Sequence, residues 1–196
     1  MTKDIENKIR IMSGISKRLF MALSSFRAAP PQLEDALFQL ASVIDSTSKH
    51  HYPNESSSKI RFVKYLKSIT TNLYRIATLG KLTIVDCTFK GTDGKQHSFG
   101  EIIYNIRCSS YHDPNEVDDL IYWGEENQIG TKDNRFIVNQ SLLQALFLML
   151  ISDDANKDHV DRSLFTDAHY LRFNQKDYPF SLFIGKRDYM LGVLGL

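Results

Sequence analysis

The chain has 196 residues, of which 42% are hydrophobic and 24% are charged, a composition typical of a globular domain and not of a disordered or fibrous chain. Two distant cysteines, Cys87 and Cys108, offer no zinc or redox motif, and a formal net charge of +1 excludes a strongly acidic or basic protein. The charged opening MTKDIENKIR contains no secretory leader, and the longest apolar run, residues 142–151, is too short to span a bilayer, so we expect a cytoplasmic protein outside the membrane.

The first half of the chain predicts helices. Apolar residues recur at helical spacing in three stretches: 3–28, 32–44 and 57–79. Pro30 and Pro31 separate the first two stretches, because proline cannot continue helical hydrogen bonding. The polar sequence DSTSKHHYPNESSS after Ile44 predicts a loop of about a dozen residues. Gly80 is expected to cap the third helix, whose buried stripe should contain Ile60, Val63, Leu66, Ile69, Leu73 and Ile76.

Short strands and two further helices are predicted next. KLTIVDCTF followed by the turn sequence TDGK indicates a strand or hairpin. A helix should begin at SFGE, where Ser98 and Glu101 form a capping box. The apolar side of that helix comprises Phe99, Ile102, Ile103 and Ile106. LIYW and RFIV predict two strands, after which Asn139 can cap a helix that is apolar nearly all round and therefore central.

The last forty residues are harder to interpret. One helix is suggested there by four residues: Val160, Leu164, Ala168 and Leu171. The final YPFSLFIGKRDYMLGVLGL is compatible with strand, helix or both. The elements together predict a mainly α protein, a helical bundle with a small β-hairpin appendage. We expect one domain with three parts: N-terminal helices (1–56), a core (57–156) and a C-terminal extension (157–196).

Basic residues gather in the third predicted helix. Residues 56–85 include six lysines and arginines and no acid, so this segment carries +6 while the rest of the chain sums to −5. Such asymmetry is compatible with an anionic partner such as RNA, but a solvated helix face balanced by acid elsewhere in the fold or in a partner is the more ordinary explanation. Candidate RNA-binding residues are Lys59, Arg61, Lys64, Lys67 and Tyr111, the last as a ring that stacks on a base or belongs to the core.

The sequence NIRCSSYHDP places Arg107 and His112 at the end of the helix that follows Ser98. Pro114 steers the residue before it out of the helical region, so the helix should end near His112, which can fold back toward Arg107. RNA cleavage without a metal needs a group that moves a proton and a fixed cation beside the phosphate. Histidine and arginine supply both. The alternative is an ordinary helix end, whose dipole favours a histidine.

IRCSSYHD resembles the R-x(4–6)-H signature of the HEPN (higher eukaryotes and prokaryotes nucleotide-binding) superfamily, and the order of elements over residues 57–156 is also similar. The resemblance implies a homodimeric helical bundle and a metal-independent endoribonuclease of toxin or defence type, with an antitoxin protein as a partner. It implies that Arg107 holds the phosphate and that His112 is the acid/base group. Cys108 and Asp113 depart from the common family residues, so a non-catalytic RNA- or protein-binding module is the alternative.

Other motifs in the sequence are less specific. Cys108 and His112 are four apart, but no orienting group or oxyanion site accompanies them as a thiol hydrolase requires. Arg162 and His169 repeat the Arg–His spacing without a capped apolar helix before them.

Metal and cofactor sites are not expected. The histidines that could in principle join acids as ligands lack zinc-site spacing; they are His50, His51 and His97. Walker, GxGxxG and GxSxG motifs are missing from the sequence, so we predict no nucleotide cofactor and no serine-hydrolase design.

Overall fold

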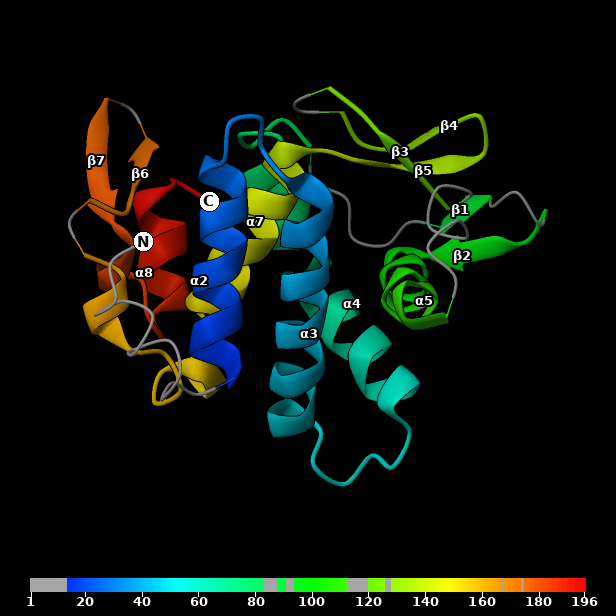
Figure 1. Cartoon of the computed structure of the whole chain (residues 1–196), viewed down its shortest axis with the longest axis horizontal. Coiled ribbons are helices and arrows are strands. Elements are labelled where there is room, and N and C mark those ends of the chain that lie inside the picture. Colours follow the sequence, from blue (N-terminus) through cyan, green and yellow to red (C-terminus); the bar gives the residue numbers. More distant parts are fainter. Residues whose placement is uncertain are drawn as a thin grey trace.

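The computed structural model describes residues 14–82, 88–90, 94–112, 120–125, 128–166, 168–173 and 175–196, apart from the side chains of 109–112. Helices dominate the described part (Figure 1), which confirms the mainly α prediction. The helices are α2 (Gly14–Arg27), α3 (Leu33–His51), α4 (Ser58–Ala77), α5 (Phe99–His112), α7 (Gln140–Ile151) and α8 (Arg187–Val193). Three short 3-10 turns are η1 (Asp154–Asn156), η2 (Arg162–Leu164) and η3 (Phe180–Leu182).

Short strands form three small sheets. The strands are β1 (Thr88–Lys90), β2 (Gln96–Ser98), β3 (Ile121–Trp123), β4 (Thr131–Lys132), β5 (Arg135–Val138), β6 (Tyr170–Phe173) and β7 (Lys176–Pro179). β1 and β2 form an antiparallel hairpin, as do β6 and β7, and the middle sheet has the order β3-β5-β4. Strand β5 pairs parallel with β3 and antiparallel with β4. The two predicted strands LIYW and RFIV are confirmed as β3 and β5. The predicted hairpin is confirmed where β1 pairs with β2, while residues 83–87 of the predicted strand KLTIVDCTF lie outside the described chain.

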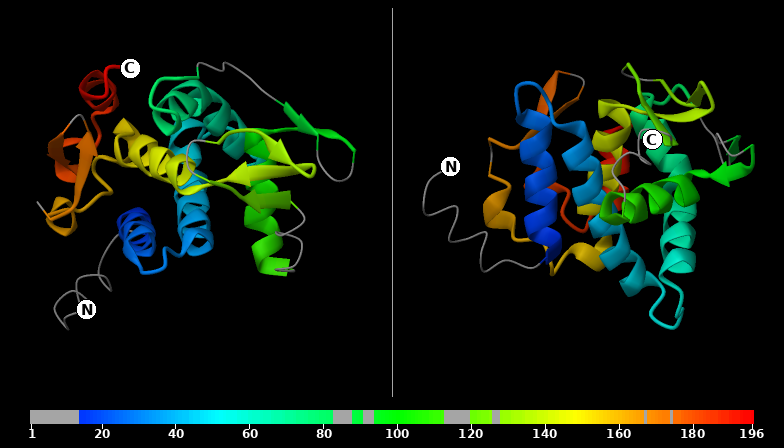
Figure 2. Two further views of the ribbon diagram at one scale, coloured as in Figure 1. Left: turned by 90° about the horizontal axis from the view of Figure 1, so that it is seen from above. Right: turned by 45° about the vertical axis from the view of Figure 1, so that its right-hand side comes forward.

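Two central helices organise the bundle. α3 packs against α2 and α4, while α7 packs against α3 and α4. α5 packs on α4 and carries the small sheets β1–β2 and β3–β5 beside it, whereas α8 and the β6–β7 hairpin lie at the opposite end of the molecule (Figures 1 and 2). The core is therefore a layer of helices with small β elements at both ends.

Helix α7 is the most buried element of the described chain. Its residues from Leu142 to Ile151 are buried except Gln144, as its nearly continuous apolar sequence predicts. The cap is also confirmed, because the Asn139 side chain accepts from the Leu142 amide at 2.9 Å. The side-chain nitrogen of Asn139, Nδ2, donates to the carbonyls of Glu125 and Gln128. One buried side chain therefore joins α7 to the strand layer.

The exit of the second helix was predicted wrongly. A loop was expected directly after Ile44, but α3 continues to His51 and leaves only residues 52–57 as the connection. Its hydroxyl side chains are satisfied inside the helix or by the core: Thr47 is fully buried and bonds Asn156 at 3.1 Å. Residues 14–27 confirm their part of the first predicted helix, and its residues 3–13 lie outside the described chain.

Helix α4 agrees with its prediction in the middle of the buried stripe, whereas Val63 and Ile76 are only half-buried. Ser57 caps it by accepting from the Ile60 amide, and the inner stripe is buried at Leu66, Ile69 and Leu73. Ile60 was expected in that stripe but is 45% exposed, because it lies on the outer side of the first turn. Gly80 has a φ of 79°, and its amide donates to the Arg75 carbonyl at 2.7 Å, which confirms the cap.

The capping box of α5 is confirmed. The amide of Glu101 donates to Ser98 Oγ at 3.3 Å, and the Ser98 amide donates back to the Glu101 carboxylate at 2.8 Å. All four predicted apolar residues of this helix are buried. The pairs of hydrogen bonds fix where the helix begins.

The helix suggested over residues 160–171 is wrong. That stretch contains η2 and then enters β6, where Leu171 and Phe173 are half-buried while Tyr170 and Arg172 are exposed. The alternation has a period of two, which suits a strand, and the pairing of β6 with β7 supplies the backbone partners.

Candidate functional site

The structure brings Arg107 to an acidic partner from another helix. Arg107 Nη2 donates to Asp45 Oδ2 at 3.0 Å, with 24% of the arginine side chain exposed. Its guanidinium also lies 6.0 Å from the centroid of the Tyr104 ring. α5 ends at His112 as predicted, but the His112 and Tyr111 side chains lie outside the described part of the chain. Pairing of Arg107 with His112 stays a prediction.

The ion pair limits what Arg107 can do. Its positive charge is offset by Asp45, whose other oxygen, Oδ1, is buried and receives no hydrogen bond from the described residues. A phosphate that contacted Arg107 would share its guanidinium charge with the Asp45 carboxylate. The ion pair with Asp45 and the packing of α3 against α5 fix the guanidinium at the flank of α5.

The basic residues of α4 divide into two kinds. Arg61 is half-buried and donates to the Glu55 carbonyl at 2.7 Å, so its role is to hold the loop before the helix. Lys59, Lys64 and Lys67 are exposed on the outer side. Lys64 Nζ lies 3.0 Å from Glu55 Oε2, and this hydrogen bond lowers the pKa of the glutamate. Of the four predicted RNA-binding residues on α4, the three lysines are therefore exposed and Arg61 is half-buried, and RNA binding by them stays a prediction.

A buried carboxylate cluster that the sequence did not predict lies at the end of α7. Asp153, only 1% exposed, accepts from His51 Nε2 at 2.8 Å and from the Tyr65 hydroxyl at 2.8 Å. It also pairs with the guanidinium of Arg187, the first residue of α8. The Asp153 cluster (His51, Tyr65, Asp153 and Arg187) thus joins α3, α4, the end of α7 and α8.

Electrostatics fix the protonation states inside the Asp153 cluster. Burial alone would raise the pKa of Asp153, but the Arg187 charge and the hydrogen bonds from His51 and Tyr65 bring it below its ordinary value. Burial, reinforced by the Asp153 charge, raises the pKa of Tyr65 well above its ordinary value. At neutral pH the carboxylate is therefore ionised and the tyrosine is a neutral donor.

The contacts of the Asp153 cluster indicate a structural role and not a catalytic one. His51 directs Nε2 at the carboxylate, and its side chain is 38% exposed. The His51 ring stacks on Tyr65 with centroids 5.3 Å apart, and among the described residues no hydroxyl or thiol donates to this imidazole. A nucleophile is thus missing from the described surroundings, and the cluster's contacts connect helices.

Removing the Tyr65 hydroxyl tests the strength of this connection. We expect Tyr65→Phe to lower the free energy of unfolding by about 1.5–3 kcal/mol, the usual contribution of a hydrogen bond to a charged group. Urea unfolding followed by circular dichroism measures it. Tyr104→Phe is the matched control, because its hydroxyl lies 3.3 Å from the Ser58 hydroxyl in a half-buried position and involves no charge. Equal losses in the two variants would contradict the assignment.

The histidines named in the sequence do not converge. Within the described residues no three His, Cys, Asp or Glu side chains are placed to hold a metal ion. The His50 ring stacks on His159 at 4.8 Å between centroids, while His97 lies in β2 on a different part of the molecule. None of the described helices is long and apolar enough to cross a membrane.

The remaining sequence motifs are separate as well. Cys108 is a half-buried free thiol, and Cys87 lies outside the described residues. His169 Nδ1 lies 3.2 Å from Thr166 Oγ1, and Arg162 belongs to the 3-10 turn η2. Burial lowers the pKa of His169, with Arg27 acting in the same direction. Among the described residues Arg162 and His169 form no catalytic arrangement, and the Cys108–His112 pair involves a side chain, that of His112, outside the described part.

Comparison with known proteins corrects the resemblance stated above. No curated protein and no solved structure matches the chain significantly. The HEPN identification is wrong, since the family that matches is a different one. An R-x(4–6)-H spacing at a proline-terminated helix is too short to define a superfamily, and the homodimer and antitoxin partner lose the basis they had in it. Residues 15–195 match the model of the Rv1289 family, and the chain belongs to that family.

Proposed function

We propose that the protein binds RNA in the cytoplasm through the α4 lysine row, defined as Lys59, Lys64 and Lys67. The observation that carries the proposal is the exposure of these three side chains on a helix of 20 residues that contains no acidic residue. Lysine is a compact, flexible point charge, which suits contact with phosphates irrespective of base sequence.

The α4 lysine row extends about 12 Å along the helix axis at a rise of 1.5 Å per residue. Lys64 and Lys67 lie about 60° apart around the helix and Lys59 about 140° from Lys64, so contact with one strand relies on the long, flexible lysine side chains. Glu55 competes for Lys64, but that ion pair is exposed, at 53% and 25% of the two side chains, and such pairs contribute about 1 kcal/mol or less. A phosphate can therefore replace Glu55 at low cost.

Binding without cleavage is favoured over ribonuclease activity by the position of Arg107. Its guanidinium is held by Asp45 at 3.0 Å, whereas a cleavage site needs a cation available to the phosphate. Cleavage by Arg107 and His112 stays a prediction, and it has a distinct product. Metal-independent attack by the ribose hydroxyl leaves a 2′,3′-cyclic phosphate.

The expected result for wild-type protein is salt-dependent binding to mixed-sequence single-stranded RNA, measured by fluorescence anisotropy. Three phosphate contacts predict a slope of about −2 for log K against log salt, or a roughly 20-fold loss between 50 and 200 mM salt. The variant Lys59→Gln/Lys64→Gln/Lys67→Gln is expected to lose most of this affinity, and its slope is expected to fall toward zero.

The matched control removes the same charge elsewhere. Lys17, Lys176 and Lys186 are exposed on α2, on β7 and just before α8, and their triple substitution by glutamine should leave RNA binding nearly unchanged. Equal losses in both triple variants, or no binding by wild type, would refute the α4 lysine row as the site. If wild type made cyclic-phosphate products and His112→Ala did not, the protein would be a ribonuclease and not only an RNA-binding protein.

A further inference from the structure

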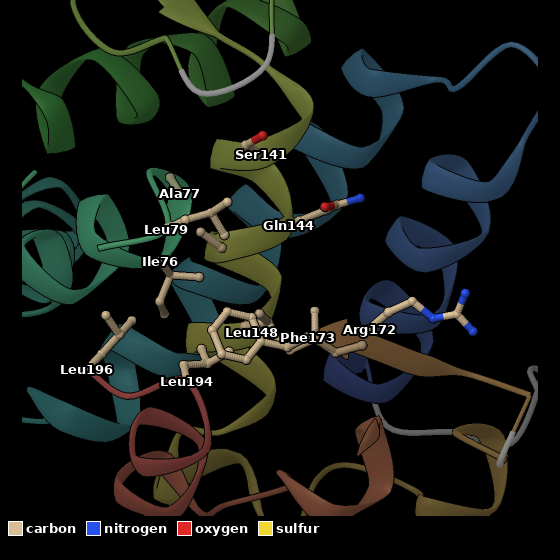
Figure 3. A pocket seen from close by; sticks show the side chains of 12 residues that line it. Ile76, Ala77, Leu79, Ser141, Gln144, Leu148, Arg172, Phe173, Leu194 and Leu196 are labelled. Carbon is tan, nitrogen blue, oxygen red and sulfur yellow. The ribbon is translucent and has the colours of Figure 1, made fainter. Parts of the chain in front are cut away.

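Two neighbouring lobes are lined by residues of α7 and β6, and Figure 3 shows the first of them. The first lobe has a volume of about 170 Å³ and is mostly apolar, and the second has about 360 Å³ and a more polar lining. The residues common to both lobes are Gln144, Leu148, Leu171 and Arg172. The two lobes are therefore neighbours that share part of their lining, and together they are called the cleft.

The apolar lobe is built from segments far apart in the sequence. Leu148 of α7 forms its base, and Phe173 of β6 lies over it, with Leu194 and Leu196 at the other side (Figure 3). A Cβ placed on Gly80 would lie 3.6 Å from Leu196 Cδ2, so these last residues rest against the turn that follows α4. The lobe is thus a formed part of the fold.

Gln144 marks where the cleft opens to solvent. It is exposed, although its neighbours along α7 from Leu142 to Ile151 are buried, and it lines both lobes. The fold gives α7 a cover of side chains everywhere except along the cleft. A polar side chain at the meeting point of an apolar and a polar lobe can orient a ligand that has both characters.

The second lobe carries positive charge. Its lining includes Arg27 and Arg172, both exposed. Arg27 donates to the Ala168 carbonyl at 2.8 Å, and Arg172 pairs with Asp177 through two hydrogen bonds of 2.7 and 2.9 Å. Arg172 faces the Asp177 carboxylate, whereas Arg27 contacts a backbone carbonyl, so these three groups together carry one net positive charge. The Arg172–Asp177 pair is exposed and is therefore weak enough to exchange with an anion.

We propose that this cleft binds a small amphipathic anion, whose apolar ring or short chain fills the first lobe and whose carboxylate faces Arg27 and Arg172. An apolar cavity of roughly 150 Å³ accommodates a benzene-sized group, which matches the first lobe. The two volumes together reach the range of small-molecule sites. A wholly apolar ligand would leave the charged lobe without a partner.

The test uses 4-phenylbutyrate and its neutral amide, 4-phenylbutyramide, on the full chain. In methyl-labelled NMR titrations the carboxylate is expected to shift the methyl resonances of Leu148, Leu171 and Leu196 saturably. The amide is expected to bind about two- to fivefold more weakly, the range for an exposed charge interaction. Equal affinities for the two compounds, or shifts confined to other leucines, would overturn the proposal.

Two variants of one ion pair distinguish ligand contact from a structural role. Arg172→Gln is expected to weaken carboxylate binding about two- to fivefold and leave amide binding unchanged, whereas Asp177→Asn is expected to strengthen carboxylate binding by a similar factor. Both substitutions break the same pair, so a purely structural role would move the affinity in one direction in both. That result would overturn the assignment of the anion to Arg172.

A third variant blocks the cleft. Gln144→Phe places a ring at the wall shared by both lobes, on an exposed position, and is expected to abolish binding of both compounds. Lys49→Phe, at an exposed position on α3, is the control for an added surface ring and should bind as wild type does. Unchanged binding in Gln144→Phe would show that the ligand lies elsewhere and would overturn the proposal.

Discussion

Replacing Asp153 with asparagine is expected to lower the free energy of unfolding by about 3 kcal/mol or more, because it removes the charge that compensates a partly buried guanidinium. Asp153 is 1% exposed and Arg187 is 27% exposed, so the arginine keeps some access to water and the loss belongs at the lower end of the range for broken buried pairs. The NH2 group of the asparagine would also face hydrogen-bond donors of the Asp153 cluster, with which it cannot form a hydrogen bond. Urea unfolding of both proteins at pH 7 measures the difference.

The same variant has a pH signature. The folded-state pKa of Asp153 is lower than its ordinary value of 3.8, so the stabilisation from its charge is complete above that value and is lost as pH falls through the folded pKa. The stability difference between wild type and Asp153→Asn is therefore expected to narrow below about pH 4. Unfolding curves collected between pH 7 and pH 3 test this directly.

Asp154→Asn is the natural control, since the neighbouring aspartate is 80% exposed and its only described ion pair is with Lys157 at 3.4 Å. Its expected effect is within about 0.5 kcal/mol. Similar losses in the two asparagine variants would contradict the central position of Asp153, because the substitutions are chemically identical and differ only in burial.

Replacing Phe147 with alanine is expected to lower the free energy of unfolding by about 3–5 kcal/mol, as large-to-small changes in a packed core do. Phe147 is 2% exposed, and its ring centroid lies 6.2, 6.3 and 5.1 Å from those of Phe26, Phe165 and Phe180. These rings belong to α2 and to the chain after α7. The substitution is therefore expected to weaken the packing of the C-terminal third of the chain against the helical bundle.

Phe147→Leu is the graded control for that prediction. Leucine keeps most of the volume and the apolar character, so the loss is expected to stay near 1.5 kcal/mol or less. Chemical unfolding measures both variants, and their order is the informative quantity. An alanine variant as stable as the leucine variant would show that the four aromatic rings do not pack as described.

Features specified by neighbouring residues could be predicted from the sequence. The Ser98–Glu101 capping box and the Asn139 cap each involve groups three residues apart, and both helices begin where expected. The extension of α3 could not be predicted, because Thr47 and His51 are held by Asn156 and Asp153, more than 100 residues later. Polar residues in a helix look like a loop until such partners are known.

The candidate site shows the same division. The sequence located Arg107 on the flank of α5 and the end of that helix at His112, because apolar spacing and Pro114 act locally. It could not show that Asp45, 62 residues earlier, receives the guanidinium. Asp153 was not among the predicted site residues, although an aspartate just after a nearly wholly apolar helix is itself a signal of a capping or buried role.

The seven-residue length of α8 has a consequence for cooperativity. A helix that short is marginal in water, so its persistence depends on contacts outside itself, among them the one that Arg187 makes with Asp153. Amide protons of α8 are therefore expected to exchange with deuterium at the rate at which the Arg187–Asp153 contact at the end of α7 opens. Local fraying of that short helix and opening of the carboxylate cluster would be a single event.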